Sequence, residues 1–165
     1  MEYIIREIKK TEYPLLENFL YEAIFVAEGA AIPPKSIIAS DDLQVYVKCF
    51  GEYKDDKGLV AEVDGEVVGA VWVRIMNDYG HLDDETPSCA ISLYKGYRRH
   101  GMGTELMKEM LKSLKDSGYK RVSLAVQKDN YALKMYQGVG FEIVDENTDE
   151  YIMVNNLRRY EICGF

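Results

Sequence analysis

A strand–helix–strand unit in the centre of this 165-residue chain constrains its fold more than any other feature. Ser88 to Tyr94 and Arg121 to Gln127 are short apolar runs that predict two strands. Between them, Gly101 to Ser117 carries leucines and methionines at helical spacing, and Gly118 follows at a position typical of a helix C-terminus. A crossover through a single helix makes the two strands it joins parallel. The sequence therefore predicts a parallel strand pair in the middle of the chain.

A β-hairpin is expected before this unit. The dipeptide Asp64-Gly65 separates Leu59–Val63 from Glu66–Ile75, and Asp-Gly favours the type I′ turn that joins antiparallel strands. The other expected elements are strands at Tyr3–Ile8, Phe141–Val144 and Tyr151–Val154, and helices from Thr11 to Ala27, from Ser40 or Asp41 to Phe50, and from Asn130 to Gly138. We therefore expect an α/β (α+β) fold in one domain, residues 1–165. Its sheet is mixed and mostly antiparallel, with a central parallel strand pair and helices on both faces.

Composition and charge exclude several classes of protein. Hydrophobic residues make up 47% of the chain and charged residues 29%, a balance typical of a globular domain. No apolar run approaches the roughly 18 residues of a membrane helix. The three cysteines are far apart and form no CxxC pair, so we expect no disulfide framework, no metal site and a cytoplasmic location. The net charge of −8 argues against binding to nucleic acid or to an anionic membrane.

A glycine-containing loop precedes the central helix. It has the sequence Arg98-Arg99-His100-Gly101-Met102-Gly103-Thr104. The two glycines allow a tight turn and a close approach of the backbone to a ligand. The first amides of the helix have no partner within the helix, and the positive end of its dipole lies behind them. Together with the flanking arginines, this pattern predicts a site for a diphosphate.

Two common phosphate-binding loops do not fit this segment. Gly96 and Gly101 have Walker A spacing, but Met102 and Gly103 occupy the positions of the required Lys and Ser/Thr. A dinucleotide-binding fingerprint needs a third glycine where this chain has Leu106. A nucleotide-binding protein therefore remains the weaker alternative.

The pattern Arg98-x-x-Gly101-x-Gly103 after an apolar strand resembles the GNAT superfamily of N-acetyltransferases. A second similarity lies downstream, where Asn130-Tyr131-Ala132 through Tyr136, followed by Gly140-Phe141, resembles the family's Asn-x-Ala-x-x-x-Tyr and Gly-Phe. The resemblance covers about Leu59 to Val154. It implies an acyltransferase that uses acetyl-CoA (coenzyme A) as donor, needs no metal, and acts on a small-molecule or peptide amine.

The resemblance also implies roles for matching residues. The segment from Arg99 through His100, Gly101, Met102 and Gly103 to Thr104 should hold the diphosphate of CoA through its amides. The strand edge at Leu93 and Tyr94 should pair with the pantetheine arm. Asn130 should hydrogen-bond that arm, and Lys134 or Arg99 should meet the ribose phosphate. Tyr136 should lie near the sulfur as the catalytic group that donates a hydrogen bond to the leaving thiolate.

The general base and the acceptor stay open. An amine with a pKa near 10 must lose a proton before it attacks a thioester. Glu85 is the candidate base, with Asp83, Asp84, Glu62 or a chain of water molecules as alternatives. The acceptor is a polyamine, an aminoglycoside, a peptide N-terminus or a lysine side chain. A non-catalytic acyl-CoA sensor of the same fold is the alternative function, and family members are often dimers, here through the final strands.

Overall fold

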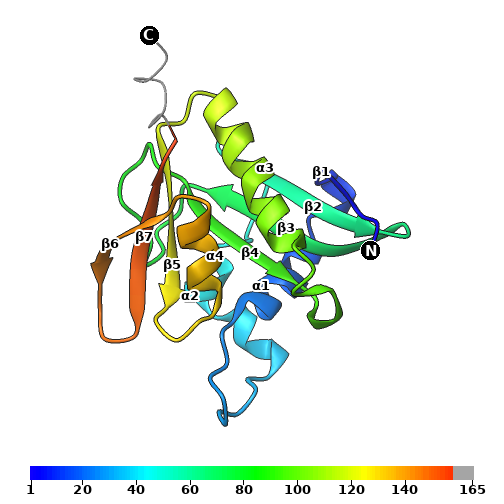
Figure 1. The fold of residues 1–165 in the computed structure, drawn as a ribbon, viewed down its shortest axis with the longest axis horizontal. Coiled ribbons are helices and arrows are strands. Elements are labelled where there is room, and N and C mark those ends of the chain that lie inside the picture. The colour runs from blue at the N-terminus through cyan, green and yellow to red at the C-terminus, as the bar shows by residue number, and fades with distance from the viewer. Residues whose placement is uncertain (158–165) are drawn as a thin grey trace.

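Seven strands form one sheet in the order β1-β2-β3-β4-β5-β7-β6 (Figure 1). The computed structural model describes residues 1–157. The strands are β1 (Ile4–Glu7), β2 (Lys57–Val63), β3 (Glu66–Arg74), β4 (Ser88–Leu93), β5 (Arg121–Gln127), β6 (Glu142–Glu146) and β7 (Glu150–Asn156). The pair β4–β5 is parallel and the other neighbours are antiparallel. The predicted mixed sheet with a central parallel pair is confirmed.

Helices cover both faces of this sheet (Figure 1). The α-helices are α1 (Leu15–Ala23), α2 (Asp41–Gln44), α3 (Met102–Asp116) and α4 (Ala132–Gly138), and the 3₁₀-helices are η1 (Lys10–Glu12), η2 (Lys35–Ala39) and η3 (Lys95–Tyr97). One core lies under α3 and α4 and includes Leu106, Met110, Leu124 and Phe141. A second core joins α1 to the opposite face through Phe19, Leu20 and Trp72. Within residues 1–157, no helix combines the length and apolar character needed to cross a bilayer.

The turn and cap predictions are confirmed by the backbone. Asp64 and Gly65 have φ angles of 50° and 83° between β2 and β3, as a type I′ turn requires. Gly118 has a φ of 91° directly after the C-cap of α3. These positions depend on short sequences, which explains why they were predictable.

The first two helices are shorter than predicted. Because Pro14 has no amide hydrogen, the chain forms a separate 3₁₀ turn before it, and α1 begins at Leu15. The second helix stops at Gln44, after which side chains of β3 capture the carbonyls of the following turns. The Trp72 indole donates to the Tyr46 carbonyl at 3.0 Å, and Arg74 donates to the Lys48 carbonyl at 2.8 Å. Tertiary contacts therefore replace helical bonds here.

The parallel pair is joined at one end only. The register between β4 and β5 contains the single pair Ser88↔Ser123, so the strands separate toward their C-termini. Tyr94 N–H donates to the Val68 carbonyl at 2.9 Å, which directs the alternate amides of Ile91 and Leu93 toward β5. Among residues 1–157, the C-terminal half of β4 thus has no strand partner on the side of the gap, where its Leu93 carbonyl accepts from Arg98 Nε at 2.9 Å.

Candidate active site

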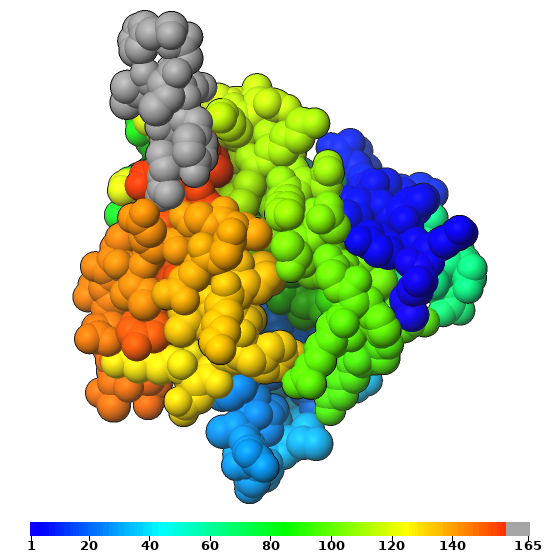
Figure 2. Space-filling view, in the orientation of Figure 1, coloured from blue at the N-terminus to red at the C-terminus, as the bar shows by residue number. Residues whose placement is uncertain are grey.

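A cleft of about 550 Å³ occupies the gap between the separated strands. Figure 2 shows it as a hollow between the segment around residue 130 and the segment around residue 100, with residues of the N-terminal part at its floor. Its walls come from both faces of the sheet. The described lining residues are Tyr21, Glu22, Ala23, Ile24, Phe25, Val26, Ile32, Pro33, Ile91, Ser92, Leu93, Lys95, Arg98, Arg99, Gly101, Gly103, Thr104, Asn130, Tyr131, Ala132, Met135 and Tyr136. The cleft therefore passes through the sheet.

One wall of the cleft is the N-terminus of α3. Gly101 is its N-cap, with a φ of 82°, and Arg99 also has a positive φ of 64°. As a glycine, Gly101 has no side chain that could cap this helix start, and Glu105 N–H donates to the Gly101 carbonyl at 3.1 Å. The amides that precede Glu105 in the first turn therefore point out of the helix with the positive end of the dipole behind them. This geometry suits an anion with several oxygens.

The edge of β4 forms the next part of the wall. Leu93 and Ile91 line the cleft and direct backbone groups into it. The backbone groups of Tyr94 are not available to a ligand in the cleft. Its N–H donates to the Val68 carbonyl, and its own carbonyl accepts from Tyr97 N–H at 2.9 Å. The Tyr94 ring packs against Phe19 with ring centroids 4.8 Å apart. Of the two residues predicted to pair with the ligand arm, only Leu93 faces the cleft.

Tyr136 faces this edge from α4. Its side chain is 8% exposed and packs edge-on against Phe141, 5.9 Å between centroids. Within residues 1–157 its hydroxyl makes no hydrogen bond, although the residue lines the cleft. Burial raises the pKa of the phenol well above its ordinary value of 10, with smaller contributions from Cys89 and Tyr131. The hydroxyl therefore keeps its proton and can donate it in a hydrogen bond.

The start of α4 closes the cleft near Tyr136. Asn130 Oδ1 accepts from Ala132 N–H at 2.9 Å, so Asn130 stabilises the first turn while its side-chain N–H groups stay available to a ligand. Across the cleft, the Arg99 guanidinium lies 5.6 Å from the centre of the Tyr131 ring. This cation–π contact places a positive charge at the mouth, beside the amides of α3.

The sequence profile of the Acetyltransferase (GNAT) family matches residues 20–141. The chain belongs to this family. It is 33% identical over 110 residues to an N-alpha-acetyltransferase of Sulfurisphaera tokodaii, which is 57% of this chain and 65% of that protein. It thus spans just under two thirds of that relative. A second N-alpha-acetyltransferase, from Saccharolobus solfataricus, is 30% identical over 127 residues, 66% of this chain and 75% of that protein.

Solved structures show the same fold. The PaiA N-acetyltransferase of Thermoplasma acidophilum, solved in complex with coenzyme A, superposes with a TM-score of 0.69 at 20% identity, covering 94% of this chain and 99% of that one. A GNAT acetyltransferase of Streptococcus pneumoniae gives a TM-score of 0.67 at 20% identity, with coverages of 94% and 99%. The GNAT fold predicted from the loop and α4 motifs is therefore confirmed.

Arg98, the first residue of the GNAT loop pattern, lines the cleft and also forms hydrogen bonds with other parts of the protein. Its Nε donates to the Leu93 carbonyl at 2.9 Å. Its Nη2 donates to the Glu22 carbonyl and pairs with the Glu22 carboxylate, both at 3.2 Å. The guanidinium therefore ties the end of β4 to the end of α1, which stabilises the cleft edge at the point where the strands separate.

Replacing Arg98 with alanine tests this clamp. We expect the free energy of unfolding to fall by about 1–2 kcal/mol, because charge-assisted bonds at a half-buried position are lost. CoA affinity should fall only about fivefold, a loss of about 1 kcal/mol. Denaturant unfolding and calorimetric titration measure the two effects. A loss of about 100-fold in affinity at unchanged stability would instead make Arg98 a direct phosphate ligand.

The remaining loop residues differ in their placement. Gly103 and Thr104 line the cleft. Met102 is 1% exposed, so it contributes its backbone to the loop and its side chain to the core. His100 and Lys134 are exposed and lie outside the lining of the cleft. Their predicted contacts with CoA therefore stay predictions, and Arg99 is the better placed of the two candidates for the ribose phosphate.

The predicted base candidates lie away from Tyr136. Glu85 is exposed and lies three residues before Ser88, the first residue of β4. Leu93 is at the other end of that strand, about 17 Å from Ser88. Asp84 is also exposed. Asp83 is ion-paired with Arg121, which lowers the pKa of its carboxyl to about 2 and makes it a weak base. The structure does not bring these carboxylates into the cleft, so the role of Glu85 stays a prediction that its position does not favour.

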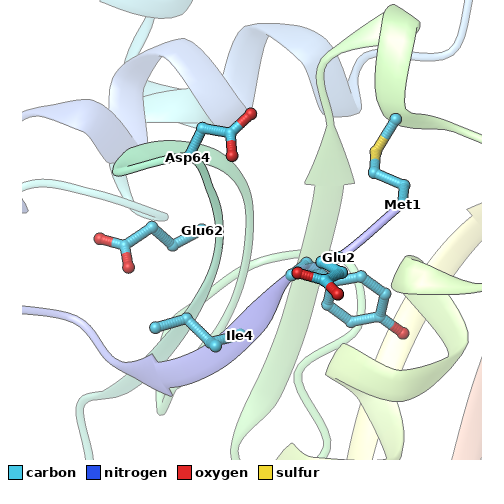
Figure 3. A pocket seen from close by; sticks show the side chains of 6 residues that line it. Met1, Glu2, Ile4, Glu62 and Asp64 are labelled. Atoms are coloured by element: carbon cyan, nitrogen blue, oxygen red, sulfur yellow. The ribbon is translucent and has the colours of Figure 1, made fainter.

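Glu62 lies in a different hollow. This second hollow, about 510 Å³, is formed by Met1 to Ile4 together with Glu62 and Asp64, at the edge of the sheet where β1 meets β2 (Figure 3). Glu62 accepts a hydrogen bond from Arg6 at 3.2 Å. It is therefore engaged by a cation and is separated from the cleft by β3.

Sequence reasoning missed one wall of the cleft. After α1 ends, Ile24, Phe25 and Val26 turn into the cleft, and Ile32 and Pro33 return to it before η2. The Tyr21 hydroxyl donates to the Pro33 carbonyl and holds the two ends of this loop together. The first helix was predicted to continue to Ala27 but ends at Ala23, so the turn of this segment into the cleft was not predicted, although Phe25 was expected among the groups that the acceptor meets.

Proposed function

We propose that this chain transfers an acetyl group from acetyl-CoA to a primary amine by direct attack of the amine on the thioester. The observation that carries the proposal is that the first turn of α3, with its free amides, and Tyr136 line the same cleft. A diphosphate at the helix start and a thioester beside Tyr136 are the two ends of one extended molecule. CoA has this chemistry, and the cleft connects both positions.

The unpaired edge of β4 supports this placement of the donor. Amide groups of a pantetheine arm can bond to the backbone groups of Ile91 and Leu93 like an added strand. The Leu93 N–H then lies where it can polarise the thioester carbonyl. Tyr136, which keeps its proton because of burial, donates a hydrogen bond to the departing sulfur.

The acceptor reaches the thioester from the opposite face of the sheet. The donor occupies the side formed by α3 and α4, so the remaining entrance lies beside α1 and its following loop. That wall is mostly apolar, with Ile24, Phe25 and Ile32. Its carboxylate, Glu22, is paired with Arg98. An amine next to an apolar group fits better than a polyamine, and relatives named N-alpha-acetyltransferases make the α-amino group of a polypeptide our proposed acceptor.

An amine panel tests the proposal. Purified protein and acetyl-CoA are combined with peptides bearing apolar or acidic first residues, with an N-terminally blocked lysine peptide, and with spermidine. We expect release of free CoA thiol with peptides whose first residue is apolar, and product masses increased by one acetyl group. Acetyl-CoA that binds without thiol release across the whole panel would favour an acyl-CoA sensor, and failure of CoA to bind would refute the proposal.

A further inference from the structure

The acceptor side of the cleft needs a group that takes a proton. An α-amino group has an ordinary pKa near 8, so at pH 7 most of it is an ammonium ion that cannot attack a thioester. The base must lie on the face opposite α3 and α4, where the amine enters. On that face Glu22 is ion-paired with Arg98 and therefore disfavoured. Another carboxylate, Glu150, lies at the start of β7.

The register of the sheet places Glu150 on this face. Alternate residues of β5, from Val122 to Val126, point into the core under α3. Gln127 therefore points to the opposite face, and Glu150 is its partner in the antiparallel β5–β7 pair. The Gln127 carbonyl accepts from the N–H of Asn130, which lines the cleft, at 3.0 Å. Glu150 thus lies at the end of the sheet where β4 and β5 have separated, one strand beyond the gap and next to the residues that line the cleft rather than among them.

A half-buried carboxylate, Asp78, acts electrostatically on Glu150 from the loop that follows β3. Asp78 accepts hydrogen bonds from the Ser88 hydroxyl at 2.9 Å and from the Tyr46 hydroxyl at 3.2 Å. Burial raises the pKa of Asp78. Both of its oxygens are occupied by hydroxyl donors, so Asp78 is oriented by the fold and is less available to a substrate.

Among residues 1–157, the carboxylate of Glu150 forms no ion pair with a Lys or Arg side chain. Burial raises the pKa of Glu150 above its ordinary value, and the charges of Asp149 and Asp78 raise it further. The phenols of Tyr46 and Tyr79 are the other titratable groups coupled to it. None of the ion pairs among residues 1–157 includes Glu150, and Lys128 at the end of β5 pairs with Glu146 instead. A carboxylate in this setting accepts a proton more readily than an ordinary surface glutamate.

We propose that Glu150 is the general base of the proposed transfer, taking the first proton from the acceptor ammonium on this face of the sheet, directly or through one water molecule. The ammonium carries three protons. One goes to Glu150, the freed nitrogen forms the C–N bond as the C–S bond breaks, one proton ends on the sulfur of CoA, and one stays on the product amide. Glu150 then returns its proton to solvent. This inference rests on the proposed function.

The matched pair Glu150→Gln and Asp149→Asn tests the assignment. Both changes remove one negative charge from the start of β7, but Asp149 is exposed and lies before the strand. We expect E150Q to lower kcat/KM about tenfold at pH 7, because only about a tenth of an α-amino group with a pKa near 8 is already neutral there. We expect D149N to stay within about twofold, because an exposed solvated carboxylate contributes little. Both variants should bind CoA like the wild type, measured by the CoA-induced rise in melting temperature.

The pH profile separates a base from a structural role. In E150Q the amine must lose its proton to water, so the activity loss should shrink as the pH rises above about 8, the ordinary pKa of an α-amino group. The variant E150D should recover part of the activity. If the wild type is active but the kcat/KM of E150Q stays within the twofold range expected for D149N at every pH, this inference is overturned and the proposed function stands. A wild type that releases no thiol with any amine would overturn both.

Discussion

Replacing Tyr136 with phenylalanine is expected to lower kcat about 100-fold, the effect typical of removing one donor to a developing negative charge. The phenylalanine ring preserves the edge-on contact with Phe141, so the fold and CoA affinity should be unchanged. Tyrosine and thiol pKa values differ ordinarily by about 1.5 units, and burial raises that of Tyr136 further, so full proton transfer to the thiolate is unfavourable. We therefore expect the hydroxyl to act mainly by donating a hydrogen bond to the sulfur. Steady-state kinetics with acetyl-CoA and a peptide acceptor measure the effect.

Tyr131→Phe is the matched control for this substitution. Tyr131 also lines the cleft and loses only a hydroxyl, but it is 60% exposed and holds Arg99 through its ring. We expect its kcat to stay within about twofold of the wild type, since the ring that makes the cation–π contact remains. If Tyr136→Phe shows the same small change, Tyr136 has no part in the chemistry.

Replacing Gly103 with aspartate is expected to weaken CoA binding at least 100-fold while leaving the fold as stable as before. A Cβ at this position would lie 3.5 Å from Leu93 Cδ1, an ordinary contact. A carboxylate in the first turn of α3 interacts favourably with the helix dipole, by about 0.3–1 kcal/mol. The same carboxylate occupies the anion site and repels a diphosphate. Calorimetry with CoA and thermal unfolding without it measure the two opposite effects.

Gly96→Asp provides the control for this charge reversal. Gly96 is exposed in η3, has open space where its Cβ would lie, and is outside the cleft lining. The aspartate of the Gly96→Asp variant carries the same charge as that of Gly103→Asp but lies outside the first turn of α3. We expect its CoA affinity to fall by no more than about threefold, because solvent and salt screen an exposed charge. An equal loss in both variants would mean that net charge, and not the amides of α3, governs binding.

The central elements were predictable because their signals are local. The strand–helix–strand unit, the Asp64-Gly65 turn and the glycine after α3 each follow from spacing or backbone preference within a few residues, and β5 has the predicted bounds Arg121–Gln127. The first helices were predicted too long. Their ends depend on the Pro14 break and on β3 side chains, which bond to carbonyls about 26 residues earlier in the chain. No local pattern reports such contacts.

The amino-acid sequence by itself determined the glycine turn at Gly101 and the free amides at the start of α3, because a glycine turn followed by a helix start presents amides whatever surrounds it. Only the tertiary structure decided which side chains lie around the cleft and on which face of the sheet each of them lies. The separation of β4 from β5 involves segments 35 residues apart, and the bond from Arg98 to Glu22 joins residues 76 apart. The electrostatic effect of Asp78 on Glu150 likewise depends on segments that are distant in the sequence. The physical reason is that backbone geometry at a helix start is local, whereas charge pairing and burial depend on chain segments that meet only in the folded protein.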